Sequence, residues 1–161
     1  MNIYDCFMYF DEDLLLDLRL NVLNKYVKKF IITESTFLHS GKSKKLNFDI
    51  KNFQKFKDKI QYIVVDKIPE GIEKVQSGDK LEIKNKKILD NSLKRENNQR
   101  NKLNSGLKGV HDEDLILSSD LDEIPNFSNF KFKKKITLFE QDVFYYKFNL
   151  LQPNFKWIGT R

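Results

Sequence analysis

Two aspartates, Asp120 and Asp122, follow a short apolar run and two serines, and they are the residues of this sequence best suited to chemistry. The run Leu115 to Leu117 is too short for a helix, and Pro125 cannot pair in a ladder, so we predict a buried strand that ends in an acidic turn. Ligands bind at the carboxyl edge of open α/β sheets, and side chains at i and i+2 of an extended segment point the same way. Paired carboxylates with ligand phosphates commonly hold Mg²⁺ or Mn²⁺. The pattern predicts a cation site, and a solvated acidic turn is the open alternative.

A polar segment over residues 90–107 is compatible with a helix whose apolar stripe is thin. It carries Arg95, Asn97, Asn98 and Arg100, and such side chains bind phosphate or the edge of a base. One face of this helix is therefore predicted to look onto a ligand rather than onto core. A solvated face laced with ion pairs is the alternative.

Other catalytic patterns are missing from the sequence. His39 and His111 are its two histidines, and neither has a partner at a trustworthy metal-ligand spacing, so a zinc site is not expected. There is no Gly-x-Ser-x-Gly elbow and no Gly-rich phosphate loop. A two-metal phosphohydrolase would need more converging carboxylates or histidines than the acidic turn offers.

The elements that must position these residues follow an alternating order. Ile3 to Phe10 reads as a strand, the next acids cap a helix that runs to about Lys28, and Phe30 to Thr33 reads as a second strand. Strand, helix, strand is the mark of a parallel unit, so the fold class is α/β. Glu34 then lies at the carboxyl end of a strand.

Further elements are predicted from spacing. The buried face of the first helix is expected to hold Leu15, Leu18, Val22 and Tyr26. Downstream we expect a helical stretch over 50–60, a third strand over 61–65, a loop over 66–79, and two strand-like runs over 136–139 and 143–151.

Length and composition bound the class of protein. The 161 residues suit one globular domain, and the formal net charge of +6 suits an anionic partner, either a phosphorylated small molecule or nucleic acid. The single Cys6 lies in an apolar run and is expected to be a buried thiol in a reducing compartment. With no signal peptide and no apolar run of membrane length, the expected location is cytoplasmic.

Read together, several segments resemble glycosyltransferase family 17, the family of the β-1,4-mannosyl-glycoprotein N-acetylglucosaminyltransferase. The matching segments cover most of the chain, and the helix and acidic-turn motifs are fairly specific. They are Tyr4-Asp5-Cys6-Phe7, Asp11-Glu12, Leu18-Arg19-Leu20, Phe30-Ile31-Ile32-Thr33-Glu34-Ser35, His39-Ser40-Gly41, Arg95-Glu96-Asn97-Asn98-Gln99-Arg100-Asn101, Ser119-Asp120-Leu121-Asp122-Glu123-Ile124-Pro125 and Trp157-Ile158-Gly159-Thr160.

The resemblance implies a GT-A fold, with a Rossmann-like nucleotide-binding half and a mixed sheet flanked by helices. It also implies a UDP-sugar donor, UDP-GlcNAc, a glycan acceptor, and Mn²⁺ (or Mg²⁺) at Asp120 and Asp122. The residues that it assigns to the nucleotide sugar are Phe10, Glu34, Arg95, Asn98, Arg100 and Asp120.

Members of this family are longer, so the resemblance implies that residues 1–161 form a single nucleotide-sugar-binding domain truncated at its carboxyl end. The general base is then expected beyond Arg161, and the chain alone is expected to show little transfer. The competing class is a basic nucleic-acid-binding domain that uses lysines and exposed aromatic residues. Against it, most Phe and Tyr residues fall in strand-like runs, where burial is expected.

Overall fold

A computed structural model describes residues 1–128, 130–132, 134–146 and 149–159. Thr160, the last residue of the Trp157 motif, and Arg161 lie outside the described residues. The elements in chain order are β1 (Ile3–Met8), α1 (Asp13–Leu23), β2 (Lys29–Ser35), the 3₁₀ helix η1 (Ile50–Phe56), β3 (Ile60–Val65), α2 (Leu81–Lys102), the 3₁₀ helix η2 (Leu103–Gly106), β4 (Leu115–Ser118), β5 (Glu140–Phe144) and β6 (Leu151–Ile158).

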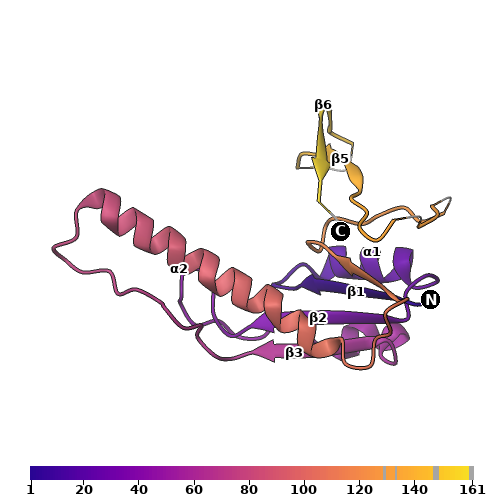
Figure 1. Ribbon diagram of the computed structural model, residues 1–161, viewed down its shortest axis with the longest axis horizontal. Coiled ribbons are helices and arrows are strands. Elements are labelled where there is room, and N and C mark those ends of the chain that lie inside the picture. Colours follow the sequence, from indigo (N-terminus) through magenta and orange to yellow (C-terminus); the bar gives the residue numbers. More distant parts are fainter. Residues whose placement is uncertain (129, 133, 147–148, 160–161) are drawn as a thin grey trace.

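Strands β1 to β4 form one parallel sheet in the order β3-β2-β1-β4 (Figure 1). The register pairs Cys6 of β1 with Ile31 of β2 on one side and with Ser118 of β4 on the other. Because the strands are parallel, their carboxyl ends meet at one edge, and the residues that follow them are brought together there. This Rossmann-like α/β arrangement confirms the predicted fold class and the parallel unit.

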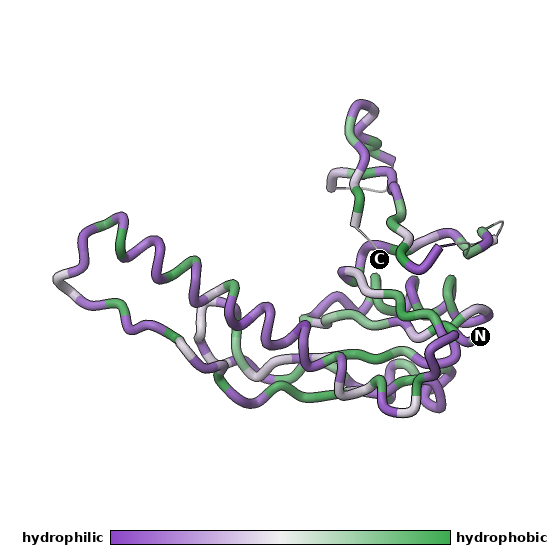
Figure 2. The backbone as a smooth tube through the Cα atoms, viewed as in Figure 1, coloured by the Kyte–Doolittle hydropathy of each residue, from purple (hydrophilic) through white to green (hydrophobic). Residues whose placement is uncertain are grey.

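The two faces of the sheet are covered by different helices, because alternate residues of a strand point to opposite faces. On one face, Phe7 and Ile32 join a core with Leu16 and Leu20 of α1 and Phe53 of η1. On the other face, Cys6 and Ile31 pack with Leu103 of η2. Figure 2 shows hydrophobic residues gathered along the strands, whereas α2 is mostly hydrophilic.

Cys6 is the buried thiol that the sequence predicts, with 2% of its surface exposed. Burial raises the pKa of this thiol to about 12, so it stays protonated and is a poor nucleophile at neutral pH. Cys6 is therefore core filler in this fold.

The predicted buried face of the first helix is correct in part. Leu15 and Tyr26 are partly buried against the core, whereas the predictions for Leu18 and Val22 are wrong. Leu18 and Val22 are 40% exposed, while Leu16, Arg19, Leu20 and Leu23 are buried. The error has a physical cause: Arg19, a charged residue, occupies the inner face at a position where the helical pattern calls for an apolar side chain.

Helix α2 begins earlier than the sequence predicts. It starts at Leu81 rather than near Asp90, and its first half extends beyond the sheet with the preceding loop beside it (Figure 1). That half has no apolar stripe against the core, since Leu81 and Leu89 are 72% and 60% exposed. This half of the helix is attached to the preceding loop by polar contacts. The backbone N–H of Glu73 donates to Asn91 Oδ1 at 2.8 Å, and Asn91 Nδ2 donates to the Glu73 carbonyl at 2.7 Å.

The two strand-like runs of the carboxyl-terminal region are also displaced. Residues 136–139 are not a strand, and the predicted strand over 143–151 is divided between β5 and β6, which pair antiparallel as a hairpin. This hairpin stands away from the sheet (Figure 1). Neither strand contains a buried residue, so apolar pattern alone could not set their limits.

None of the helices in the described residues combines the length and the apolar character needed to cross a membrane.

Candidate active site

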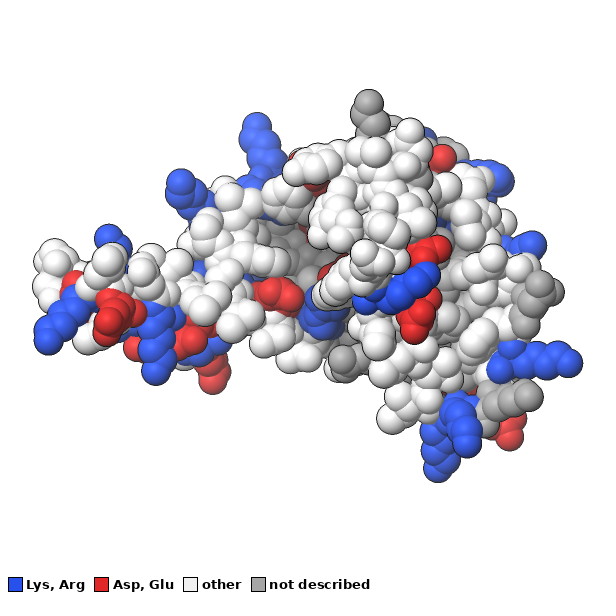
Figure 3. Space-filling view, turned by 90° about the horizontal axis from the view of Figure 1, so that it is seen from above, with Lys and Arg blue, Asp and Glu red and all other residues white. Residues whose placement is uncertain are grey.

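A cavity of about 540 Å³ opens at the carboxyl edge of the sheet. It is bounded by the segment after β1, the loop after β2, one face of α2 and the turn after β4. The lining residues are Met8, Tyr9, Phe10, Glu12, Leu15, Phe37, Leu38, His39, Lys44, Glu96, Gln99, Arg100, Asp120, Leu121 and Asp122. Figure 3 shows the surface hollowed near the centre of the molecule, with acidic and basic side chains close by. We call this space the first cavity.

Both predicted metal-binding acids line the first cavity. Asp120 lies two residues after the end of β4, and Asp122 lies in the tight turn that comes next, which we call the acid turn (Asp120–Glu123). The Glu123 amide donates to the Asp120 carbonyl at 3.1 Å, so the segment is folded back rather than extended. Asp120 and Asp122 still face one space, because both are exposed and both line the same cavity.

Arg19 holds the backbone of the acid turn from below. The guanidinium is fully buried and pairs with Asp5 of β1 through two bonds of 2.9 and 2.7 Å. Its remaining nitrogen donates to the carbonyls of Asp120, Leu121 and Glu123 at 2.8, 3.0 and 3.1 Å. Because these carbonyls point toward Arg19, the acid turn presents its carboxylates, and not these carbonyls, to the cavity.

Glu123 closes the acid turn from the other side. Its carboxylate accepts a hydrogen bond from the Asp120 amide at 3.0 Å and another from the indole N–H of Trp157. Glu123 is 8% exposed. An extended turn predicts a Glu123 side chain that points away from the two aspartates, but the tight turn makes it a cap for their backbone instead.

Helix α2 contributes a cationic group to the first cavity. Arg100 pairs with the Asp120 carboxylate at 2.8 Å and with Glu96, one turn earlier, at 3.5 Å. Gln99 is buried and donates to the carbonyl of Thr33 at 3.0 Å, which fastens this end of the helix to β2. The thin apolar stripe of this segment predicted a face that does not pack against the core, and this face of α2 does line a cavity.

The two other α2 residues assigned to the nucleotide lie elsewhere. Arg95 donates to the carbonyl of His39 at 2.9 Å, and a Cβ on Gly41 would come within 2.6 Å of its guanidinium. It therefore braces the loop that carries His39 into the cavity. Asn98 bonds the carbonyl of Lys67 at 3.2 Å, in the loop after β3, and does not line the cavity.

Phe10 and Glu34 also differ in position. The Phe10 ring is 43% exposed and lines the first cavity. Glu34 is fully buried, and its carboxylate accepts from the side chain of Lys44, the amides of Asn47 and Phe48, and the hydroxyl of Tyr62. Glu34 thus reaches the cavity through Lys44, which lines it.

In one of these bonds the Tyr62 hydroxyl is the donor and the Glu34 carboxylate the acceptor. Burial first, and then the hydrogen bond to Glu34, raise the pKa of Tyr62 above the ordinary value. The phenol therefore stays protonated and remains a donor to the carboxylate.

Four residues at or beside the candidate site were not predicted from the sequence: Arg19, Glu123, Lys44 and Gln99. All four lie inside the quoted motifs or beside them, but their roles depend on contacts between distant segments. Arg19 and Asp120 are 101 residues apart in the chain. For Arg19 the sequence offered one indication: a charged residue falls on the inner face of the predicted helix. A buried guanidinium requires a partner, so such a residue predicts a polar contact in the core.

The donor set of the acid turn fits a hard divalent cation. Among the described residues, no group of three or more His, Cys, Asp or Glu side chains could hold a metal ion. Two carboxylates that face one cavity are what a cation needs when diphosphate oxygens and water supply its other ligands.

The family model of glycosyltransferase family 17 matches residues 1–157, nearly the whole chain. The chain belongs to glycosyltransferase family 17. No curated protein and no solved structure matches it significantly. Membership makes the protein a glycosyltransferase, an enzyme class that requires a sugar donor and an acceptor, and the first cavity is therefore its candidate active site.

The aromatic residues divide into two groups, which bears on the nucleic-acid alternative. In the sheet and its helices, buried rings include those of Phe7, Phe30 and Phe53, and Tyr62 of β3 is partly buried. Those of the hairpin are exposed, with Phe155 at 47% and Tyr146 at 99%. The expectation of burial, which counted against a nucleic-acid-binding domain, thus holds for most aromatic residues of the sheet and its helices and fails for the hairpin.

Proposed function

We propose that this protein is a metal-dependent glycosyltransferase that binds a UDP-sugar, UDP-GlcNAc, in the first cavity and transfers the sugar to a glycan acceptor. Asp120 and Asp122 would hold Mn²⁺ (or Mg²⁺). The observation that carries the proposal is that the Asp120 and Asp122 carboxylates and the Arg100 guanidinium line one cavity in a family 17 chain.

The side chains around the first cavity can each take a part in donor binding. Arg100 has five N–H donors, so its guanidinium can contact a diphosphate while it keeps its bond to Asp120. Lys44 adds a second positive charge to the wall, with its Nζ 5.1 Å from the centre of the Phe10 ring. The exposed Phe10 ring offers a flat face for a base.

The cation, when bound, would neutralise charge on the diphosphate leaving group. For the chain's own residues, the requirement is that the two aspartates stay ionised and aligned. Arg19 and Glu123 supply alignment, since between them they bind three carbonyls and one amide of the acid turn. Asp122 is exposed, and no described basic residue forms an ion pair with it, whereas Asp120 is shared with Arg100. Asp122 is therefore the better candidate for direct cation contact.

Calorimetric titration with UDP, in Mn²⁺ and in EDTA, tests this function. We expect binding that requires Mn²⁺, a loss of at least tenfold in affinity for Asp122→Asn, and a smaller loss for Asp120→Asn. Both variants should melt like the parent, because the substituted side chains are exposed. Asp112→Asn, an exposed acid outside both the first cavity and the acid turn, is the matched control.

Three results would contradict the proposal. They are equal UDP affinity in EDTA, parental affinity in Asp122→Asn, and tight, salt-sensitive binding of single-stranded DNA without UDP binding.

A further inference from the structure

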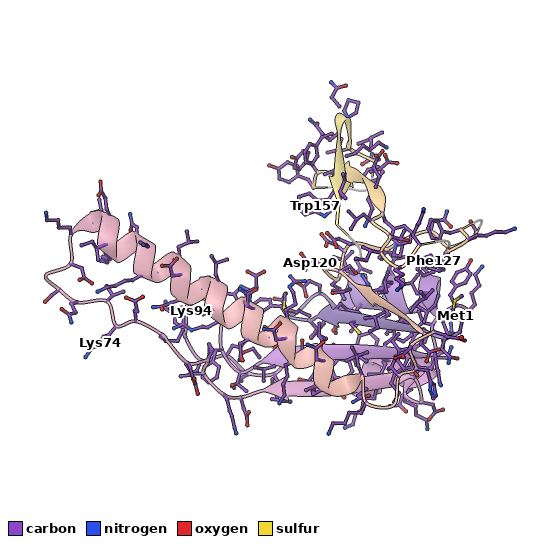
Figure 4. All side chains as sticks on the ribbon, viewed as in Figure 1. Met1, Lys74, Lys94, Asp120, Phe127 and Trp157 are labelled. Carbon is purple, nitrogen blue, oxygen red and sulfur yellow. The ribbon has the colours of Figure 1, made fainter. Side chains whose placement is uncertain are left out.

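A second cavity, of about 990 Å³, lies on the other side of the acid turn, between α1 and the hairpin. Its walls come from the first turn of α1, the acid turn and both hairpin strands. The lining residues are Leu14, Leu15, Asp120, Asp122, Glu123, Gln141, Asp142, Val143, Phe144, Tyr145, Tyr146, Phe155 and Trp157. Figure 4 shows Asp120 at the base of the hairpin with Trp157 above it.

The two cavities share a wall at the acid turn. Asp120 and Asp122 line both of them. A ligand in the first cavity and a ligand in the second would therefore approach each other at these two carboxylates. That is the layout which a two-substrate transfer requires, since the reacting atoms must come within bonding reach.

The second cavity has an aromatic wall with polar groups at its margin. Phe155 and Trp157 are two residues apart on β6 and so point to the same face of the hairpin, where Gln141 is paired with Trp157. Both rings are 47% exposed. A pyranose ring has an apolar C–H face and a rim of hydroxyl groups, so aromatic faces with nearby carboxylate and amide groups suit it.

The acidic residues that line the second cavity indicate which class of ligand it can bind. Four carboxylates line it, those of Asp120, Asp122, Glu123 and Asp142, and no Lys or Arg is among the described lining residues. Arg100 pairs with Asp120 and Lys156 with Asp142, so acids still outnumber their basic partners, and an anionic ligand such as nucleic acid or an acidic lipid is disfavoured there. A neutral ligand with many hydroxyl donors would be favoured, because carboxylates accept hydrogen bonds.

We infer that the second cavity is the acceptor site, and that it binds a neutral pyranose of the acceptor glycan against the aromatic residues of the hairpin. This inference rests on the proposed function, because it takes the first cavity as the donor site. It also explains why the hairpin exposes apolar side chains that a surface without a ligand would not favour.

The test uses Trp157, the single tryptophan of the chain, as its own reporter. Its fluorescence is followed while N,N′-diacetylchitobiose, α-mannotriose or cellobiose is added in the presence of Mn²⁺ and UDP. We expect a saturable change with at least one saccharide. Phe155→Ala should weaken that binding at least tenfold, and Ile158→Ala, the next exposed apolar residue on the opposite face of β6, should change it less than twofold.

Tyr146→Asn is a second variant that avoids any question of folding. Tyr146 is 99% exposed, so loss of its ring removes little packing beyond its tilted contact with the Tyr145 ring, and Asn tolerates its positive φ of 59°. We expect this variant to weaken saccharide binding several-fold with an unchanged thermal melt. Calorimetry with UDP and Mn²⁺ should give parental affinity for both hairpin variants.

The outcomes separate the inference from the proposed function. If UDP binds with Mn²⁺ but no saccharide alters Trp157, or if both hairpin variants bind saccharide like the parent, the acceptor site is wrong and the donor site stands. If UDP does not bind, the proposed function itself fails. A dimer in sedimentation that Phe155→Ala dissociates, without saccharide binding, would make the hairpin an interface between copies.

Discussion

Arg19 joins three parts of the chain that are far apart in sequence: helix α1, strand β1 through Asp5, and the acid turn. Its side chain and that of Asp5 are both fully buried, and the hydroxyl of Ser119 accepts a further bond of 2.6 Å. A buried ion pair is a weak source of net stability, but removal of one partner leaves a buried charge without compensation. We therefore infer that the main role of the Arg19–Asp5 pair is to position the backbone of the acid turn, and with it the two aspartates.

The first residue-scale prediction is that Arg19→Met lowers the free energy of unfolding by about 3–5 kcal/mol, since it strands the Asp5 carboxylate in the core. Urea unfolding followed by circular dichroism measures the change. Where the variant remains folded, Mn²⁺-dependent UDP affinity should fall as well, because three carbonyls of the acid turn lose their donor. Lys51→Met, an exposed lysine of η1, should cost less than about 0.5 kcal/mol. A stable Arg19→Met protein with parental UDP affinity would contradict this role.

The second residue-scale prediction concerns Glu34. It distinguishes a Glu34 side chain that contacts the UDP-sugar directly from one that only holds the protein groups around it. Four protein donors converge on its carboxylate, and a Gln side chain would satisfy only part of them. Glu34→Gln should therefore lower the free energy of unfolding by about 3 kcal/mol. UDP affinity, measured at a temperature where the variant is folded, should fall only modestly through displacement of Lys44. A parental melt combined with a large loss of UDP affinity would instead favour direct donor contact. Glu70→Gln, an exposed acid, is the control for stability.

At the scale of elements, the order of strands and helices was predictable and its details were not. The strands of the parallel sheet are short apolar runs whose period and flanking residues are local properties, so their positions followed from sequence. The buried face of α1 was not predictable in the same way. Leu15 and Leu18 satisfy a helical period as well as Leu16 and Leu20 do, and the choice between them depends on Asp5, which lies on another strand.

In the candidate site, too, some positions were predictable from the local sequence and others were not. The acid turn, Phe10 and Arg100 were predictable because each sits at an element end or on a polar helix face, and the parallel sheet brings these places together. Arg95, Asn98 and Glu34 carry suitable groups, yet each contacts a loop rather than the cavity. Loop contacts depend on backbone conformation at distant positions, which residue type and spacing do not encode.

At the scale of the whole molecule, the acid turn stands between a packed sheet and an exposed hairpin. The sheet side is held by Arg19 and by two hydrophobic cores, whereas the hairpin meets the turn through the bond from Trp157 to Glu123. The Glu123 carboxylate thus contacts both the Asp120 amide and the hairpin. A ligand that draws the hairpin toward the acids would act on the same carboxylate that caps them.

The last prediction follows from this unequal packing. No residue of β5 or β6 is buried, whereas β1 and β2 are almost wholly buried, and isolated hairpins are marginally stable in water. On heating, the fluorescence of Trp157 should therefore change several degrees below the loss of far-ultraviolet circular dichroism, which reports the sheet and helices. N-acetyltryptophanamide heated in parallel corrects for thermal quenching. A saturating saccharide that occupies the second cavity should bring the two transitions closer, since it binds the ordered hairpin and not the melted one. Coincident transitions without ligand would mean that the hairpin and the sheet unfold as one unit, and the hairpin would then be a fixed wall of the site rather than a part ordered by its acceptor.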